Sequence, residues 1–197
     1  MKIISLVKMD KGRARICLDN GADFVLYKKE YLAYGIVEGG SLTETQYNEI
    51  FNDILVPRCK KRAMHLLEKQ DRSERNLRDK LRDGGYPIAA IDAAIAYLES
   101  FGYIDDSRVA ASYIRFYQDS RSRLRIKQDL LKKGIKEEII LNCLDEEYEA
   151  DETILIENLL SKRHYDKDEA TYEEKAKTYR FLASKGFSSD AINKALS

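Results

Sequence analysis

The same spacing of apolar residues around a glycine occurs three times in this sequence. A leucine lies four residues before each glycine, and branched apolar residues follow it at six and ten positions. The glycines are 49 and 52 residues apart, a period typical of stacked supersecondary repeats. The three sets are Leu81, Gly85, Ile91 and Ile95; Leu130, Gly134, Ile140 and Leu144; and Leu182, Gly186, Ile192 and Leu196.

Each repeat is predicted to contain a helix that ends at its glycine. Glycine readily adopts the left-handed conformation that closes a helix, and the apolar residue after it is placed to pack back on that helix. A further helix is expected two or three residues later, with Pro87 and Ser188 as suitable starting residues in the first and last repeats. The residues that follow the glycines are Tyr86, Ile135 and Phe187.

With the helix ahead of it, this helix pair forms a three-helix module of about fifty residues. The modules are expected at residues 57–104, 105–149 and 150–197. Because repeats of this kind contact mainly their neighbours, we expect them to form an elongated array.

Residues 1–56 follow a different pattern. Short alternating apolar runs predict strands, and Asn20-Gly21 between two of them indicates a hairpin, because both residues tolerate positive φ. Thr43-Glu44 then opens a short helical stretch. The predicted fold is therefore mainly α, with a small antiparallel β segment ahead of the repeats.

Short motifs also recur in a fixed order along the repeats. They are Arg72-Ser73-Glu74-x-x-Leu77-Arg78-x-x-Leu81 with Gly85, Gly102-Tyr103-Ile104-Asp105-Asp106 with Ala110 and Tyr113, Leu130 with Gly134-Ile135, and Arg180-Phe181-Leu182 with Gly186-Phe187. In this order and spacing, roughly residues 57 to 197 resemble the RecX family. The N-terminal strand segment is similar to an extension found in some branches of that family.

The resemblance implies a modulator of the RecA recombinase in recombinational DNA repair and the SOS response. Such a protein binds along the groove of the RecA filament on single-stranded DNA and restrains its ATPase, strand-exchange and co-protease activities. The expected partner is therefore the RecA–DNA filament, and the protein is expected to act as a monomer.

The sequence also argues against several other functions. It lacks a signal peptide and the run of about eighteen apolar residues that a membrane span needs, so a cytoplasmic protein is expected. Cys17, Cys59 and Cys143 lie far apart and the two histidines lack a ligand partner, so we expect reduced structural cysteines and no metal site. No nucleophile–base constellation or Walker-type phosphate loop can be assembled by spacing, so we expect no enzyme and no cofactor.

The net charge of zero conceals an uneven distribution. Residues 1–56 sum to about −1, residues 57–134 to about +7 and residues 135–197 to about −6. A basic middle suits a partner that carries phosphates, although each block could equally be an ordinary solvated surface.

Two rows of basic residues are the candidate filament- or DNA-binding site. At about 100° per residue, these rows lie away from the apolar residues of the helix that precedes each of the first two glycines. Arginine offers bidentate contacts to phosphate or carboxylate, but the rows could also be solvated faces neutralised by nearby aspartates. The residues are Arg75, Arg78 and Arg82 in the first repeat, and Arg121, Arg125 and Lys132 in the second.

Other polar and aromatic residues have structural explanations. Ser73 is predicted to cap a helix, and Tyr103-Ile104-Asp105-Asp106 to form a joint between modules. Most tyrosines, including Tyr97, Tyr113 and Tyr179, are expected to pack in a core or at its rim and not to stack on bases.

Two other functions remain open at this stage. A protein that binds DNA directly would bind naked DNA with a steep salt dependence. A helical-repeat adaptor for an unrelated protein would leave RecA activity unchanged.

Overall fold

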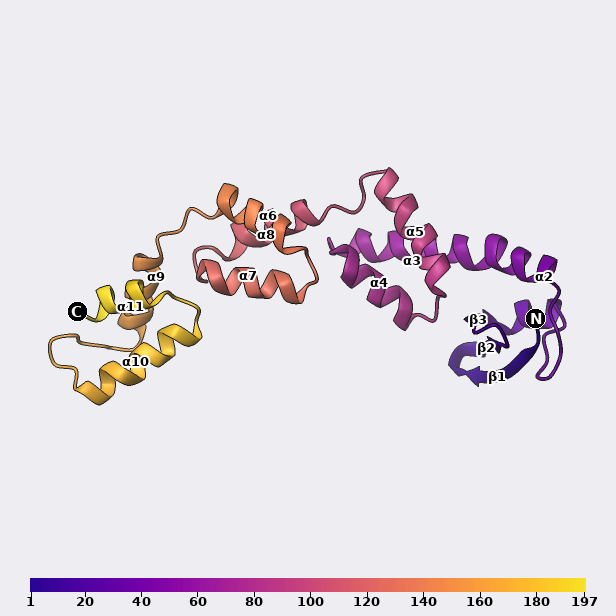
Figure 1. Ribbon diagram of the computed structural model, residues 1–197, viewed down its shortest axis with the longest axis horizontal. Coiled ribbons are helices and arrows are strands. Elements are labelled where there is room, and N and C mark those ends of the chain that lie inside the picture. Colours follow the sequence, from indigo (N-terminus) through magenta and orange to yellow (C-terminus); the bar gives the residue numbers. More distant parts are fainter. The chain divides into compact units, whose positions relative to one another are not determined.

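The computed structural model describes residues 1–197. The fold is mainly helical, with a small three-stranded antiparallel sheet near the N-terminus, as the sequence predicts. The chain forms two compact units, Met1–Asp105 and Asp106–Ser197 (Figure 1). The division between them falls within the motif that was predicted to be a joint.

The N-terminal sheet has the strand order β1-β2-β3. Its strands are β1 (Ile3–Met9), β2 (Arg13–Leu18) and β3 (Asp23–Tyr27), with the short 3-10 helix η1 (Asp10–Gly12) between the first two. Gly21 has a φ of +83°, and its N–H donates to the carbonyl oxygen of Leu18 at 3.0 Å. The hairpin predicted at Asn20-Gly21 is confirmed.

A short helix and then a long helical run lead from the sheet into the first repeat. The elements are α1 (Lys28–Ala33), followed by α2 (Glu44–Glu49), the π-helical η2 (Ile50–Leu55) and α3 (Val56–Lys69). Thr43 starts the run with a reciprocal cap, in which its hydroxyl accepts from the N–H of Gln46. The junctions at Ile50 and Leu55 keep right-handed helical geometry, so the helix continues through Pro57. The π-helical turn lies directly ahead of Pro57, which has no N–H to donate to the preceding turn.

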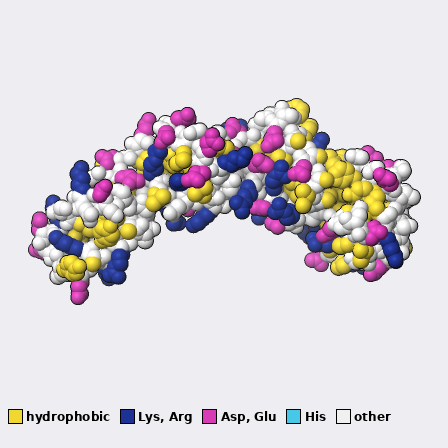
Figure 2. Space-filling view, in the orientation of Figure 1, with side chains coloured by type: hydrophobic (Ala, Val, Ile, Leu, Met, Phe, Trp, Pro, Cys, Tyr) yellow, Lys and Arg dark blue, Asp and Glu magenta, His cyan; other side chains and the backbone are white.

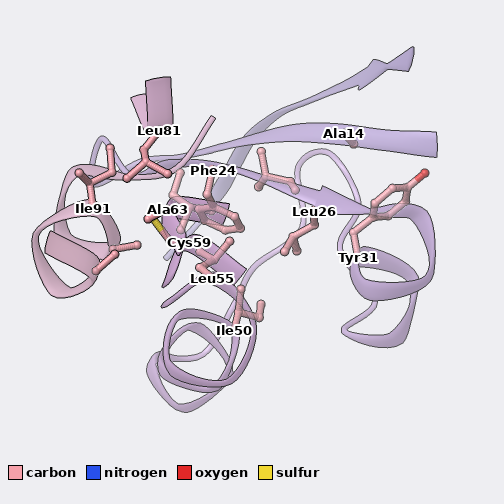
Figure 3. Packing of buried hydrophobic residues seen from close by; sticks show 14 of the residues in the cluster. Ala14, Phe24, Leu26, Tyr31, Ile50, Leu55, Cys59, Ala63, Leu81 and Ile91 are labelled. Atoms are coloured by element: carbon pink, nitrogen blue, oxygen red, sulfur yellow. The ribbon is translucent and has the colours of Figure 1, made fainter. Parts of the chain in front are cut away.

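The sheet and the first repeat share one hydrophobic core. Figure 3 shows buried side chains of β2 and β3 facing those of the long helical run and of α4 (Glu74–Asp83) and α5 (Ile88–Ser100). The core therefore continues across residue 56, the expected boundary between the N-terminal segment and the first repeat. The division of the chain into segments 1–56, 57–104, 105–149 and 150–197 stays a prediction. Labelled members of the core are Ala14, Phe24, Leu26, Tyr31, Ile50, Leu55, Cys59, Ala63, Leu81 and Ile91.

The second unit contains the second and third repeats. The second repeat consists of α6 (Asp106–Tyr117), α7 (Arg123–Lys132) and α8 (Glu137–Glu147). The third consists of α9 (Glu152–Lys162), α10 (Tyr172–Ser184) and α11 (Ser189–Leu196). Each repeat has its own cluster of buried residues, as a modular array requires.

The middle helix of every repeat ends as predicted. Gly85, Gly134 and Gly186 have φ values of +82°, +81° and +88°, which place all three in the left-handed region. Ile135 and Phe187 are buried after their glycines, and Tyr86 is partly buried against the first core. The repeated Leu-to-Gly spacing therefore reports a real structural repeat.

The second and third repeats meet at the N-terminus of α7. The buried Ser122 caps this helix by accepting from the N–H of Arg125 at 3.2 Å, and its hydroxyl donates to the carbonyl oxygen of Lys185 at 2.8 Å. A Cβ atom on Gly186 would lie 2.8 Å from the Ser122 hydroxyl oxygen. This turn of the third repeat therefore fits closely against the second.

Candidate functional site

The candidate arginines of the first repeat lie on α4. Ser73 caps this helix by accepting from the N–H of Asn76, which confirms the predicted cap. Arg75 is exposed and makes no ion pair. Arg82 is also exposed, but its guanidinium contacts Asp79 at 2.7 Å. Arg75 therefore offers the more available charge of these two side chains.

Arg78 has a structural position between two helices. Its Nε atom donates to Glu74 at 2.6 Å within α4, and Nη1 donates to Asp92 of α5 at 2.5 Å. Burial lowers the pKa of Arg78, but the hydrogen bonds and charges of Glu74 and Asp92 outweigh it and raise the pKa above its ordinary value. The guanidinium thus links α4 to α5 and has little charge left uncompensated.

In the second repeat, Arg121 and Arg125 converge on one carboxylate. Arg121 lies ahead of the cap Ser122, outside α7, and its Nη1 donates to Asp129 Oδ2 at 2.7 Å. Arg125 approaches the same oxygen at 3.5 Å. Lys132, near the other end of α7, is exposed and makes no ion pair. The structure therefore brings Arg121 and Arg125 together and leaves Lys132 apart.

Aromatic rings hold Arg121 in place. Its guanidinium carbon lies 3.7 Å from the ring centroid of Tyr117, and Nη1 donates to the hydroxyl of Tyr113 at 2.6 Å. The two rings are 4.4 Å apart, and burial, with the charge of Asp129, raises the pKa of Tyr113. Phe116, whose ring is 4.7 Å from Tyr117, is 77% exposed. We call Tyr113, Phe116, Tyr117, Arg121 and Arg125 the arginine–aromatic cluster.

Sequence reasoning missed this cluster. Tyr113 packs at the rim of the second core, as expected for most tyrosines, but it also orients a candidate arginine. The available signal was the spacing of Tyr113 and Tyr117, four residues apart on one helix and directly ahead of Arg121. Tyr97, which is also expected to pack in a core or at its rim, is 38% exposed and its ring lies beside that of Phe101.

The two basic rows do not occupy equivalent positions in their repeats. Counted from the capping serines, Arg121 of the second repeat corresponds to Arg72 of the first. Arg72 is not one of the candidate residues. At about 100° per residue, Arg125 and Lys132 lie about 110° around the helix from the row on α4. The two rows are therefore offset from each other relative to the start of their helices. Binding by the six residues individually stays a prediction.

Basic and acidic side chains are mixed over the visible surface. Figure 2 shows Lys and Arg side chains on both units, interspersed with Asp and Glu. Where a cation has an acidic neighbour, as at Arg82, its field is partly cancelled.

The structure contains no group of three or more His, Cys, Asp or Glu side chains that could hold a metal ion. No disulfide joins the cysteines. None of the helices combines the length and apolar character needed to cross a membrane.

Comparison with protein-family models matches each repeat in chain order. Residues 59–98 match RecX, first three-helix domain; residues 105–144 match RecX, second three-helix domain; and residues 151–196 match RecX, third three-helix domain. These ranges contain the Leu-to-Gly pattern of every repeat.

Curated relatives extend the similarity over nearly the whole chain. Regulatory protein RecX of Clostridium perfringens (strain SM101 / Type A) is 30% identical, with 96% of this chain and 91% of that protein covered. Regulatory protein RecX of Caldanaerobacter subterraneus subsp. tengcongensis is 28% identical, with 100% and 98% covered.

Solved structures give the same result. A crystal structure of regulatory protein RecX has a TM-score of 0.67 and 26% identity, with 98% of each chain covered. The crystal structure of RecX from Lactobacillus salivarius has a TM-score of 0.59 and 27% identity, with 72% of this chain and 94% of that chain covered.

Proposed function

The chain belongs to the RecX family of regulatory proteins, and we propose that it binds the RecA–DNA filament and restrains RecA. The activities affected are the ATPase, strand exchange and co-protease functions. The observation that carries the proposal is the match to all three RecX three-helix domains in order, within relatives named regulatory proteins that align over nearly the full chain. We further propose a cytoplasmic monomer with no catalytic activity of its own.

The available cations suit a partner that presents carboxylates and phosphates. Arg75 and Lys132 are exposed and have no acidic partner, so their charge is available to a ligand. Arg121 differs, because the rings of Tyr113 and Tyr117 fix its guanidinium before any ligand arrives. A fixed guanidinium loses less side-chain entropy on binding than a mobile one.

The test is the DNA-dependent ATPase of RecA on single-stranded DNA, measured with substoichiometric amounts of the full-length chain. A regulator that acts on a filament should lower the rate at a ratio well below one per RecA subunit. Heat-denatured protein at the same concentrations is the control for nonspecific effects. An unchanged ATPase rate at every ratio, stoichiometric excess included, would contradict the proposal.

Direct binding to DNA is a second candidate function, favoured by the arginine–aromatic cluster. Cations beside exposed rings can contact phosphates and stack on bases, and Phe116 is 77% exposed. Affinity for naked single-stranded DNA should then fall steeply with salt concentration. A filament regulator should instead bind tightly only when RecA is present, so binding measured with and without RecA separates the two functions.

A further inference from the structure

The third repeat has a groove between its last two helices. The groove has a volume of about 540 Å³ and lies between α10 and α11. Ala176 and Tyr179 line it from α10, and Leu196 lines it from α11. The basic residues Lys175 and Arg180 also line it. The groove therefore combines an apolar floor with positive charge.

The second repeat has a groove at the corresponding place. Its volume is about 470 Å³, and Arg123, Leu124, Lys127 and Leu144 line it. These residues lie 52 positions before Lys175, Ala176, Tyr179 and Leu196, which is the spacing between Gly134 and Gly186. Both grooves are thus the same feature of the repeated module.

In the second repeat, the chain itself contributes a segment to this groove. The segment Asp145–Glu152 runs from the last turn of α8 to the first residue of α9, and its Tyr148 and Glu152 line the groove beside Arg123. The ring centroid of Tyr148 lies 5.9 Å from the guanidinium carbon of Arg123, and its hydroxyl donates to the carbonyl oxygen of Arg121 at 3.1 Å. Burial in this position raises the pKa of Tyr148.

Acidic residues on both sides of Tyr148 reinforce the contact. Asp145 forms an ion pair with Arg123, and Glu152 accepts from the backbone N–H of Arg123 at 2.8 Å. In the second repeat, an aromatic side chain carried on an acidic segment therefore forms one wall of the groove beside Arg123. The basic residue on which this depends is retained in the third repeat, because Lys175 corresponds to Arg123 and Arg180 adds a second charge.

We propose that the groove between α10 and α11 binds an acidic peptide segment of a partner protein that carries an aromatic residue. The ring lies on the apolar floor, and the carboxylates pair with Lys175 and Arg180. A second copy of the chain is a poor occupant, since its own acidic segment is held by Arg123 and by the carbonyl of Arg121. This inference does not depend on the identity of the proposed filament partner.

The probe is a fluorescently labelled, terminally blocked peptide with the sequence of residues 144–152, Leu-Asp-Glu-Glu-Tyr-Glu-Ala-Asp-Glu. Its binding to the full-length chain is measured by fluorescence anisotropy. The same peptide with Tyr148→Ala should bind at least about tenfold more weakly, because burial of a tyrosine ring contributes roughly 1.4 kcal/mol or more. Equal binding of the two peptides, or no binding at millimolar concentration, would overturn the proposal.

A variant protein assigns the binding to this groove. Ala176→Glu places a longer, negatively charged side chain in the groove and should weaken peptide binding at least about tenfold. Ala183→Glu introduces the same charge at an exposed position of α10 that does not line the groove, and should leave affinity unchanged. Equal affinity of the two variants would overturn the proposal, because the peptide would then bind elsewhere.

Sedimentation velocity tests the competing occupant. The wild-type chain should sediment as a monomer at the concentrations used for peptide binding. A dimer that Ala176→Glu dissociates and Ala183→Glu preserves would assign the groove to a second copy and overturn the proposal.

Discussion

The hydroxyl of Ser122 donates a hydrogen bond to the carbonyl oxygen of Lys185, 2.8 Å away, and thereby joins the second repeat to the third. The hydroxyl oxygen of Ser122 also accepts a hydrogen bond from the N–H of Arg125 and thereby caps α7. One buried side chain thus starts a helix and closes a junction. Two different losses are therefore expected when it is removed.

We expect Ser122→Ala to lower the free energy of unfolding by about 2 kcal/mol. Loss of the cap costs about 1 kcal/mol, and loss of the hydrogen bond to Lys185 costs a similar amount. Ser188→Ala is the matched control, since Ser188 caps the exposed start of α11, and it should cost only about 1 kcal/mol. Urea denaturation followed by circular dichroism measures both. Equal losses would show that the Lys185 contact contributes nothing.

Gly186→Ala tests the close fit of the same junction. The residue has a φ of +88°, and an added Cβ would lie 2.8 Å from the Ser122 hydroxyl oxygen and 3.2 Å from the Arg125 nitrogen. Left-handed strain and steric overlap together should cost about 2 to 4 kcal/mol. Gly102→Ala has similar backbone strain at a φ of +67° with open space around it, and should cost only about 1 kcal/mol. Thermal and urea unfolding of both variants would detect the difference, and similar losses would contradict the proposed clash.

The modular fold was predictable because it depends on local signals that repeat. Leu130, Gly134 and Ile140 occupy the same relative positions as their counterparts in the other repeats, and hydrophobic burial with left-handed glycine geometry fixes the local fold at each. The shared core of the sheet and first repeat was not predictable in the same way. Packing of Phe24 against a helix that contains Leu55 depends on residues distant in sequence.

The candidate site was only partly predictable, for a related reason. Helical spacing places Arg78 on the outer side of α4, but spacing does not reveal that Asp92 of the next helix neutralises it. Helical spacing also predicts that Arg121 lies on a basic row of a helix, whereas the helix starts only after Arg121, at the cap Ser122. Which cations keep available charge is therefore determined by tertiary contacts and turn geometry.

This distinction between available and paired cations leads to a prediction for filament binding. The double variant Arg75→Ala/Lys132→Ala removes two exposed charges that have no ion pair, so we expect filament affinity to fall about 5- to 30-fold, or about 0.5–1 kcal/mol for each charge. Unfolding should be unchanged within about 0.5 kcal/mol. Arg78→Ala is the contrasting variant and should cost about 1 kcal/mol of stability, because it breaks the contacts to Glu74 and Asp92.

Filament binding is measured by fluorescence anisotropy with RecA assembled on labelled single-stranded DNA, and stability by urea denaturation. Unchanged affinity of the double variant would remove Arg75 and Lys132 from the binding surface. A loss of affinity that only accompanies unfolding would assign them a structural role.

Cys59 gives the chain a pH-dependent stability at alkaline pH. Burial raises the pKa of this thiol from 9.0 to about 12. The folded protein therefore retains a proton that the unfolded chain releases above about pH 9. The unfolded state binds fewer protons in this range, so the free energy of unfolding should fall as pH rises from about 9 towards 12.

Cys59→Ala should remove this part of the pH dependence, although the variant is less stable at every pH because it leaves a small cavity. Urea denaturation between pH 8 and pH 10.5 compares the slopes of the wild type and Cys59→Ala. Thiol labelling gives an independent measurement. The thiolate is the reactive form of cysteine, and the buried Cys59 keeps its proton in the folded protein. Cys59 should therefore react with a disulfide reagent only as fast as the first unit opens. Rapid labelling of Cys59 under native conditions, or equal slopes in wild type and Cys59→Ala, would show that the folded core does not hold this proton.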